Sequence, residues 1–232
     1  MSDAEEPQIA EPHAQGTHAG EPPIGRITSL KAQVEAQGRV SIFVDGQFAF
    51  GVNRDVVLEF GLKKGFKLTE QVQRAILERE NHFRARFTAL NFLSYRDRSE
   101  HEMRVRLQKS KHSESAIEST IDYLKSSRLL NDASFAITYA EGRFRSGGYG
   151  PVRVRHDLRK KGIDDASIEQ AIEEVYSEVE DLMTTARDLG RRRWEKLSRE
   201  KDDRKRRKKV YDHLARRGFP YAVVRTILDE LS

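Results

Sequence analysis

Residues 102–124 read EMRVRLQKSKHSESAIESTIDYL, residues 153–175 read RVRHDLRKKGIDDASIEQAIEEV, and residues 209–231 read KVYDHLARRGFPYAVVRTILDEL. The three segments align without a gap, and apolar residues stand at the second, sixth, sixteenth, twentieth and twenty-third positions of each. Residues four and seven apart share one face of an α-helix, so the pattern predicts two short amphipathic helices joined by a tight turn. Such a unit cannot bury its apolar face alone, and the three copies therefore predict a tandem helical array.

The composition limits the class of protein. The chain has 232 residues, of which 37% are hydrophobic and 34% are charged, and it contains no cysteine. Such a chain fills several small helical cores rather than one large one, and it has no thiolate for catalysis, metal binding or a disulfide. It has no apolar run of about 20 residues, and its N-terminus does not read as a signal peptide, so we expect a cytoplasmic protein without a membrane contact.

The charge is divided unevenly along the chain. Residues 1–25 contain five acids and four prolines but no Lys or Arg, which predicts a disordered acidic tail. Without these five negative charges, the net charge rises from +5 for the whole chain to +10 for residues 26–232. A folded part this basic predicts a polyanionic or acidic partner, such as DNA, RNA or a protein filament wrapped around DNA.

Residues 26–68 are predicted to form a small β-sheet domain with a short helix. Apolar residues alternate with period two, and turn pairs stand at Gln37-Gly38 and Asp45-Gly46, so we expect three antiparallel strands. Two-residue turns would pair Val34 with Ser41, Ala32 with Phe43, Phe43 with Phe48, and Ser41 with Phe50. That register would bury one face, made of Leu30, Ala32, Val34, Phe43, Phe48 and Phe50. A base-stacking surface is the alternative use of the phenylalanines.

The helical part is predicted to contain three helices in each repeat, with the 23-residue segments supplying the last two. Ser99 and Glu102 form a capping box, Asp132 can cap the first helix of the second repeat, Pro151 suits a first helical position, and Gly162 suits a left-handed helix end. The fold class is therefore mainly α, an elongated, curved array of tandem three-helix repeats preceded by a three-stranded antiparallel sheet. The expected repeats are residues 69–130, 131–181 and 182–232.

Basic residues recur at equivalent places in the repeats, which favours a shared binding groove. The segment from 187 to 209 is longer than its counterparts, and we expect one long basic helix at the start of the third repeat. Residues 164–183 carry eight acids and no Lys or Arg, so the basic helices could instead pair with acidic neighbours. The candidate contacts are Arg98, Arg104, Arg106, Arg143, Arg145, Arg153, Arg155, Lys160, Lys161, Arg191, Arg192 and Arg193.

Four aromatic residues near these basic segments could stack on bases, and we expect three of the four to serve packing instead. They are Tyr95, Phe144, Tyr149 and Trp194.

No catalytic or metal-binding arrangement is predicted. The seven histidines are scattered without metal-ligand spacing, and no serine stands in a nucleophile elbow. Gly61 and Gly65 are separated by three residues, whereas a phosphate-binding P-loop has four and a lysine directly after the second glycine. We therefore expect neither an enzyme nor a cofactor, and we interpret the segment around these glycines as a linker.

Several short segments, in their order and spacing, resemble the RecX family, bacterial regulators of the RecA recombinase. The matching segments are residues 89–93 (ALNFL), 95–100 (YRDRSE), 129–132 (LLND), 135–136 (FA), 150–163 (GPVRVRHDLRKKGI) and 214–231. The N-terminal sheet resembles an extension found in part of that family.

This resemblance implies a regulator without an active site that lies along the groove of the RecA-DNA filament. It implies inhibition of RecA's ATP hydrolysis, strand exchange and coprotease activity, and so modulation of recombination and the SOS response. The implied partners are the RecA filament and single- or double-stranded DNA, contacted directly or through RecA, and we expect a monomer. The alternatives are an independent DNA- or RNA-binding helical-repeat protein and a scaffold that uses the acidic residues 164–181.

Overall fold

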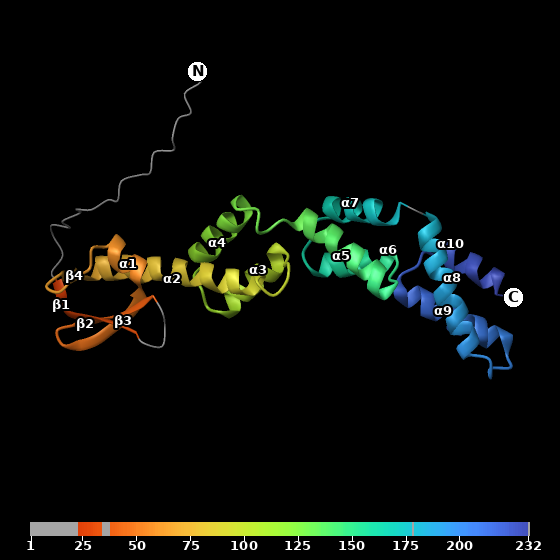
Figure 1. Cartoon of the computed structure of the whole chain (residues 1–232), viewed down its shortest axis with the longest axis horizontal. Coiled ribbons are helices and arrows are strands. Elements are labelled where there is room, and N and C mark those ends of the chain that lie inside the picture. The colour runs from red at the N-terminus through yellow and green to blue at the C-terminus, as the bar shows by residue number, and fades with distance from the viewer. Residues whose placement is uncertain (1–22, 34–37, 178, 232) are drawn as a thin grey trace, which may run out of the picture. The chain divides into compact units, whose positions relative to one another are not determined.

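The computed structural model describes residues 23–33, 38–177 and 179–231 (Figure 1). Within them lie four strands and ten helices: β1 (Pro23–Ala32), β2 (Arg39–Val44), β3 (Gln47–Asn53), α1 (Arg54–Glu59), β4 (Lys67–Thr69), α2 (Glu70–Leu93), α3 (Glu100–Lys109), α4 (Glu114–Ser126), α5 (Asp132–Gly147), α6 (Pro151–Lys160), α7 (Asp165–Tyr176), α8 (Val179–Lys196), α9 (Asp203–Arg217) and α10 (Tyr221–Glu230). The mainly α class is confirmed. The chain divides into two compact units, one of residues up to 88 with 111–120, the other of 89–110 with residues from 121 onward.

The sheet has four strands rather than the predicted three, in the order β3-β2-β1-β4. β4 lies in the segment that we interpreted as a linker, and it pairs Leu68 with Gly25 and Lys67 with Arg26. Its three residues are too few for a period of two to be recognised in the sequence. Since β1 begins at Pro23, residues 23–25 belong to a strand, although the sequence placed them in the tail. The rest of the predicted tail, residues 1–22, lies outside the described residues.

A β-bulge in β3 changes the predicted register. The Asp45-Gly46 turn is confirmed, with φ of 49° and 85°, and so is the pairing of Phe43 with Phe48. Phe50, however, pairs with Ile42 rather than Ser41, so one extra residue, Ala49, stands between the two pairs. Because side chains alternate across a sheet, a bulge shifts the residues on its two sides to opposite faces.

The buried face of the sheet differs from the predicted one, both because of this bulge and because β1 and β2 pair in another register, with Lys31 rather than Val34 opposite Ser41. Phe50 is buried as expected and Leu30 packs against the core, but Phe43 and Phe48 lie on the opposite face, and Ala32 pairs with Val40 instead of Phe43. Val34 lies outside the described residues. α1 and the start of α2 cover the buried face (Figure 1). The core consists of Ile27, Ile42, Phe50, Val52, Val56, Leu62, Leu68 and Ile76.

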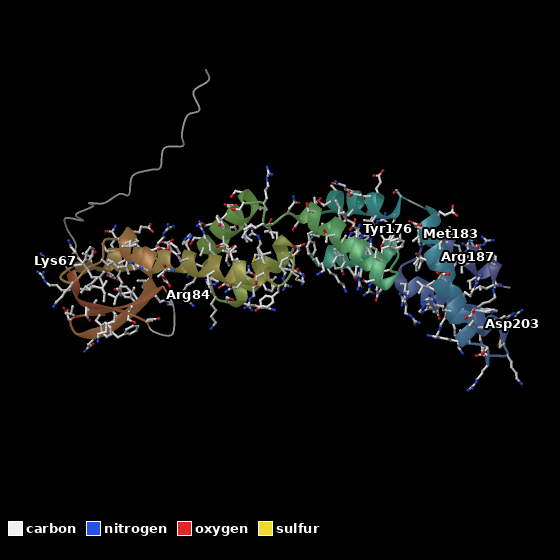
Figure 2. All side chains as sticks on the ribbon, in the orientation of Figure 1. Lys67, Arg84, Tyr176, Met183, Arg187 and Asp203 are labelled. Atoms are coloured by element: carbon white, nitrogen blue, oxygen red, sulfur yellow. The ribbon has the colours of Figure 1, made fainter. Side chains whose placement is uncertain are left out.

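The repeated apolar pattern marks the buried side of the helices, as predicted. All five positions are fully buried in the first segment, and the first four are buried in the second. In the third segment the first three positions are buried, while Leu228 and Leu231 pack partly exposed against one core that α5 to α10 share. Arg187 on α8, labelled in Figure 2, forms a bidentate ion pair with Glu230 on α10, with a shortest distance of 2.7 Å.

The predicted helix ends are confirmed at three places and wrong at one. Ser99 and Glu102 form the capping box of α3, Pro151 opens α6, and Gly162 has the left-handed φ of 76°. The residue that caps α5 is Asn131, one position before Asp132. The Asp132 carboxylate instead accepts a hydrogen bond of 2.8 Å from the backbone N–H of Glu100, at the N-terminus of α3.

The first helix of the third repeat, α8, is long and carries basic residues as predicted, but it ends at Lys196, and residues 197–202 separate it from α9. α3 and α6 begin two residues before the first residue of their 23-residue segments, whereas α9 begins six residues before it. α9 therefore carries one additional turn at its N-terminus, capped by Asp202.

A hydrogen bond between equivalent positions joins successive repeats at two places, which we call the joints. At the first, the Ser99 hydroxyl donates to the carbonyl of Lys161 over 2.7 Å. At the second, the N–H of Gly150 donates to the carbonyl of Arg217 over 2.8 Å. Ser99 aligns with Gly150, and Lys161 aligns with Arg217, so in the first two repeats the residue that precedes the middle helix contacts the turn of the next repeat.

At the corresponding position of α9 stands Arg206, within the additional turn. Its guanidinium lies 3.9 Å from the centre of the Trp194 ring and donates to the Trp194 carbonyl over 2.8 Å. In the third repeat, this position therefore contacts a residue of the same repeat, whereas in the first two repeats it contacts the following repeat.

The turn of the first repeat contains a strained residue. Lys111 has φ of 60°, and it aligns with Gly162 and Gly218, whose φ values are 76° and 85°. A left-handed backbone costs a residue other than glycine about 1–2 kcal/mol, while glycine loses about 0.5–1 kcal/mol more chain entropy on folding. Lys111→Gly should therefore stabilise the protein by about 0.5–1 kcal/mol, measured by urea unfolding. A loss of stability would show that the lysine side chain contributes more than the strain costs.

Candidate polyanion-binding site

Six of the twelve predicted basic contacts are held by carboxylates within the folded chain. Arg155 on α6 forms a bidentate pair with Glu169 on α7, with both distances 2.8 Å. The alternative of pairing between basic and acidic neighbours is thus realised between these two helices. The other pairs are Arg104–Glu100 (2.8 Å), Arg143–Asp157 (3.2 Å), Arg153–Asp157 (3.0 Å), Arg145–Glu141 (3.7 Å) and Lys161–Glu102 (2.6 Å).

The remaining six have no carboxylate within ion-pair distance in the part of the chain that the structure describes. Arg98 is the most constrained, because its guanidinium lies 3.8 Å from the centre of the Phe92 ring and donates to the Phe92 carbonyl. Arg193 is half-buried. Four are exposed and available to a partner: Arg106, Lys160, Arg191 and Arg192.

One cleft gathers basic side chains from three separate helices, and we call it the arginine cleft. It has a volume of about 480 Å³, and it lies where the end of α5 meets α8 and α9. Arg145, Arg192 and Arg217 line it, together with the hydroxyls of Ser146 and Thr185 and with one acid, Asp188. Guanidinium groups and hydroxyls are the groups that proteins use to hold phosphate or carboxylate oxygens. The cleft can therefore accept an anionic group of a partner.

The glycines beside the cleft shape its wall. Gly148 ends α5 with the left-handed φ of 55°, and Gly150 lies so close to Gly218 that a Cβ there would stand 2.3 Å from the Gly218 carbonyl oxygen. The glycine-rich stretch is thus structural, and it allows the chain to turn from α5 into α6 while forming the second joint.

Tyr149 positions two arginines rather than stacking on a base. The guanidinium of Arg143 lies 3.8 Å from the centre of its ring, and that of Arg217 lies 5.5 Å away. Arg217 also donates to the carbonyl of Gly147. The Tyr176 hydroxyl donates to the Tyr149 carbonyl over 2.7 Å, and burial raises the pKa of Tyr176 above its ordinary value, so this hydroxyl remains a donor.

Three of the four aromatics serve packing, as predicted. Phe144 meets Tyr176 edge to face at 5.1 Å, Tyr149 lies against arginines, and Trp194 lies against Arg206. Tyr95 is 83% exposed.

Sequence reasoning identified Arg145 and Arg192 but missed Arg217. A signal for Arg217 was present, because it aligns with the candidate Lys161. In both repeats this position is the last before the left-handed glycine, at the joint. Its side chain is thereby directed toward the preceding repeat in both cases, at Glu102 for Lys161 and at Gly147 for Arg217.

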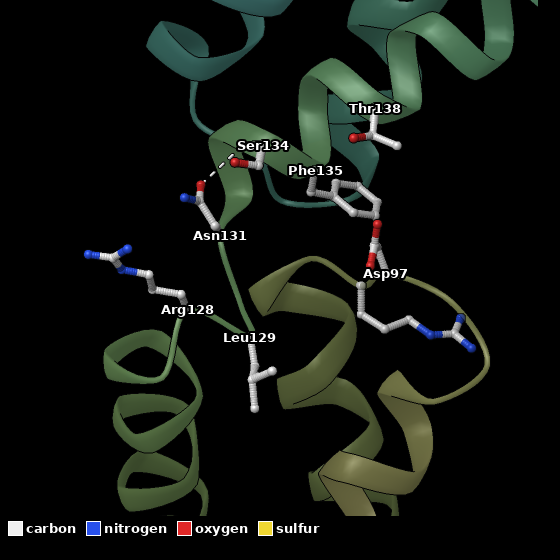
Figure 3. Close-up of a pocket in the computed structure, with 8 residues that line it drawn as sticks. Asp97, Arg128, Leu129, Asn131, Ser134, Phe135 and Thr138 are labelled. Atoms are coloured by element: carbon white, nitrogen blue, oxygen red, sulfur yellow. Dashed lines mark hydrogen bonds between the residues drawn. The ribbon is translucent and has the colours of Figure 1, made fainter.

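A second, smaller cleft of about 120 Å³ lies near the first joint (Figure 3). It is lined by Arg98 and Arg128 along with Asp97, Asn131 and Phe135. The Asn131 side chain, which caps α5, accepts from the N–H of Ser134 over 3.0 Å (Figure 3). Asp97 would repel an anion in this cleft, and Arg98 is held by Phe92. This cleft is therefore a poorer anion-binding site than the arginine cleft.

The first joint is sensitive to acid through Glu102. Burial of its carboxylate raises the pKa, but hydrogen bonds from Arg96 and Lys161 outweigh burial and lower the pKa from 4.5 to about 2. A carboxyl group whose pKa is lower in the folded state stabilises the fold above its unfolded pKa, and this stabilisation is lost as pH falls toward the folded value. Glu102→Gln should therefore be less stable than the natural protein at pH 7, and the difference should shrink between pH 4.5 and 2. Urea unfolding across this range measures it, and a difference independent of pH would contradict the assignment.

Two further kinds of site are absent from the described residues. They hold no group of three or more His, Cys, Asp or Glu side chains that could bind a metal ion. None of their helices has the length and apolar character that crossing a membrane requires.

Comparison with known proteins places all four parts of the chain. Family models match residues 25–69 (Regulatory protein RecX N-terminal domain), 85–124 (RecX, first three-helix domain), 131–172 (RecX, second three-helix domain) and 180–228 (RecX, third three-helix domain). A curated relative from Clostridioides difficile (strain 630), named Regulatory protein RecX, is 33% identical over 90% of this chain and 96% of its own length. One from Bacillus velezensis, with the same name, is 33% identical over 88% of this chain and 76% of its own length.

A solved structure, described as "Crystal structure of regulatory protein RecX", is similar over 89% of this chain and 100% of its own length. Its TM-score is 0.69 and its sequence identity is 29%. The curated relatives are named as regulatory proteins.

Proposed function

Because this chain belongs to the RecX family of regulatory proteins, we propose that it binds the RecA-DNA filament and inhibits RecA. Inhibition would extend to ATP hydrolysis, strand exchange and coprotease activity, and so it would modulate recombination and the SOS response in the cytoplasm. Such a regulator acts by occupying the filament, and it needs only surfaces of the right shape and charge. We propose further that it acts as a monomer whose three repeats, residues 69–130, 131–181 and 182–232, form a curved array.

The arginine cleft is the observation that carries this proposal. A filament of protein on DNA presents phosphates and acidic side chains, and the cleft offers two side chains that can reach them, Arg145 and Arg192. Both are exposed, and the longest ion pair among the twelve candidates is that between Arg145 and Glu141, at 3.7 Å. A loosely held guanidinium can exchange its internal partner for a phosphate at small cost.

The test is the ATPase rate of RecA on single-stranded DNA in the presence of substoichiometric amounts of this protein. We expect the rate to fall at ratios well below one molecule per RecA protomer, because one bound molecule would span or block several protomers. An ATPase rate equal to that without the protein, at any ratio up to equimolar, would refute the proposal.

Independent binding to DNA is the second candidate function. It is favoured by exposed basic residues outside the arginine cleft, among them Arg106, Lys160 and Arg191. Direct binding should weaken steeply with salt, since the logarithm of the binding constant falls by about 0.7 per decade of salt for each phosphate neutralised on a single strand. Tight binding to bare DNA, together with an unaffected RecA ATPase, would favour this function over the first.

The acidic scaffold is the weaker alternative. Arg155 and Arg159 on α6 hold two of the acids on α7, Glu169 and Asp165, over 2.8 and 2.9 Å. A basic partner would have to displace an arginine from each of these two carboxylates.

A further inference from the structure

The face of the sheet that α1 and α2 do not cover carries a pair of phenylalanines. Phe48 on β3 is 61% exposed, and Phe43 on β2 is half-buried. Their rings meet edge to face with centres 5.9 Å apart. Neither ring packs against the core of this unit. An aromatic side chain with this exposure keeps a large apolar surface in contact with water. A binding partner could cover the surface of this pair.

The bulge at Ala49 is what brings Phe48 to this face. In a regular strand, Phe48 and Phe50 would share a face, and both would enter the core, as the alternating pattern predicts. The extra residue leaves Phe50 buried and turns Phe48 outward, opposite Phe43. Bulges that re-aim one side chain in this way are over-represented beside functional sites.

The surroundings of the pair are cationic and polar. The ammonium group of Lys31 lies 5.0 Å from the centre of the Phe43 ring. Ser29 pairs with Phe43, and Ser41 pairs with Lys31, so both hydroxyls belong to the same face. The Gln33 amide donates to the Ser41 hydroxyl over 2.9 Å. None of the residues at these register positions is acidic.

We propose that this face, made of Phe43, Phe48 and Lys31, binds single-stranded nucleic acid by stacking its bases on the phenylalanines. An unpaired strand offers flat apolar bases joined by negative phosphates, and the face offers aromatic rings beside an ammonium group and neutral hydroxyls. Base stacking on exposed aromatics is the means by which proteins hold single strands without reading their sequence. The proposal concerns a surface on the N-terminal sheet, and it does not depend on the arginine cleft or on inhibition of RecA.

A protein partner is the competing explanation for exposed phenylalanines. The apolar centres of protein interfaces are depleted of lysine, whereas Lys31 lies over the ring of Phe43 itself. The register positions named above also hold no carboxylate that would repel phosphate. The ammonium group of Lys31 and the lack of carboxylates at these positions therefore favour single-stranded nucleic acid over a protein partner.

The test compares the full-length natural protein with Phe48→Ala in binding a labelled oligothymidylate, followed by fluorescence anisotropy over a range of salt concentrations. We expect Phe48→Ala to weaken binding about 10-fold, within the range known for loss of one stacked base. Because stacking involves no counterion, the loss should be the same at every salt concentration. Lys31→Gln should instead reduce the slope of binding against salt, by about 0.7 for one phosphate.

Two ligands and two variants complete the design. A strand of the same length without bases, and duplex DNA, should bind equally well to the natural protein and to Phe48→Ala, because neither offers a free base. Phe48→Trp should restore binding. Phe87→Ala is the matched control, since Phe87 lies on α2 and is 69% exposed, and it should bind like the natural protein.

Three results would overturn the proposal. The first is unchanged binding of oligothymidylate by Phe48→Ala, and the second is an equal loss on the strand without bases. The third is that Phe48→Ala keeps its affinity for the oligonucleotide but loses the ability to inhibit RecA, which would assign the face to a protein partner.

Discussion

Gly218→Ala should destabilise the protein by about 3 kcal/mol or more, because it opens the second joint. Gly218 has φ of +85°, and a Cβ added there would stand 2.3 Å from the backbone nitrogen of Arg153 and 2.8 Å from its Cα. The left-handed backbone costs alanine about 1–2 kcal/mol. Relief of the contact with backbone atoms requires that the joint separate, which adds about 1–3 kcal/mol. Urea unfolding gives the change in the free energy of unfolding.

Hydrogen exchange locates the effect, since the protons lost first should include the N–H groups of Gly150 and Val152, which donate across the joint to Arg217 and Gly218. Gly142→Ala is the control. Gly142 lies within α5 with no atom within 4 Å of an added Cβ, so its replacement should stabilise the protein by about 0.5–1 kcal/mol. If Gly218→Ala stays within about 0.5 kcal/mol of the natural protein, the joint is not the close contact described above.

Reversal of charge in the arginine cleft should have the largest effect on function. Arg145→Glu with Arg192→Glu replaces two guanidiniums with carboxylates at a surface proposed to meet phosphates or acidic side chains. Loss of two charge-assisted hydrogen bonds, at about 1.5 kcal/mol each, corresponds to about 100-fold in affinity before any repulsion is counted. The concentration that halves the RecA ATPase rate should rise by at least that factor.

The matched control is Lys208→Glu with Arg225→Glu. Both residues are exposed on the third repeat, outside the cleft, and the double variant has the same net charge as the cleft variant. It should inhibit RecA within about three-fold of the natural protein if short-range contacts decide binding. Equal losses in the two variants would mean that only the overall charge of the chain counts.

The helical repeats could be read from the sequence because their signal is redundant. Three copies give the same spacing, and each burial position is supported by two others, so a chance match is excluded. The period of a helix does not depend on long-range contacts. Ser99, which caps α3, and Pro151, which opens α6, both act within one turn of the chain. Local rules therefore sufficed for these elements.

The sheet could be predicted only in part because its register depends on pairing between segments. The Asp45-Gly46 turn is local and was predicted correctly. The bulge at Ala49 leaves no mark in an alternating pattern, and one inserted residue transfers Phe48 from the core to the surface. β4 forms only because β1 offers an edge to pair with, and three residues carry no period of their own.

The candidate site, like the sheet, could be predicted only in part from the sequence. Charge runs identified the basic segments, but they could not tell which guanidiniums are held within the fold. Arg155 is engaged by Glu169, fourteen residues away, whereas Arg145 and Arg192 come together where the end of α5 meets α8 at the cleft. Only the arrangement of the helices distinguishes an arginine that is paired within the fold from one that is available to a partner.

The joints also make the protein modular in length. The second repeat contains both halves of the contact, since Gly150 receives the turn of the following repeat and Lys161 meets Ser99 of the preceding one. A duplicate of this repeat, inserted between the second and the third, would find a complementary neighbour on each side. The array could then be lengthened by one whole repeat, with contacts of the kind already present at the joints and no new contact surface.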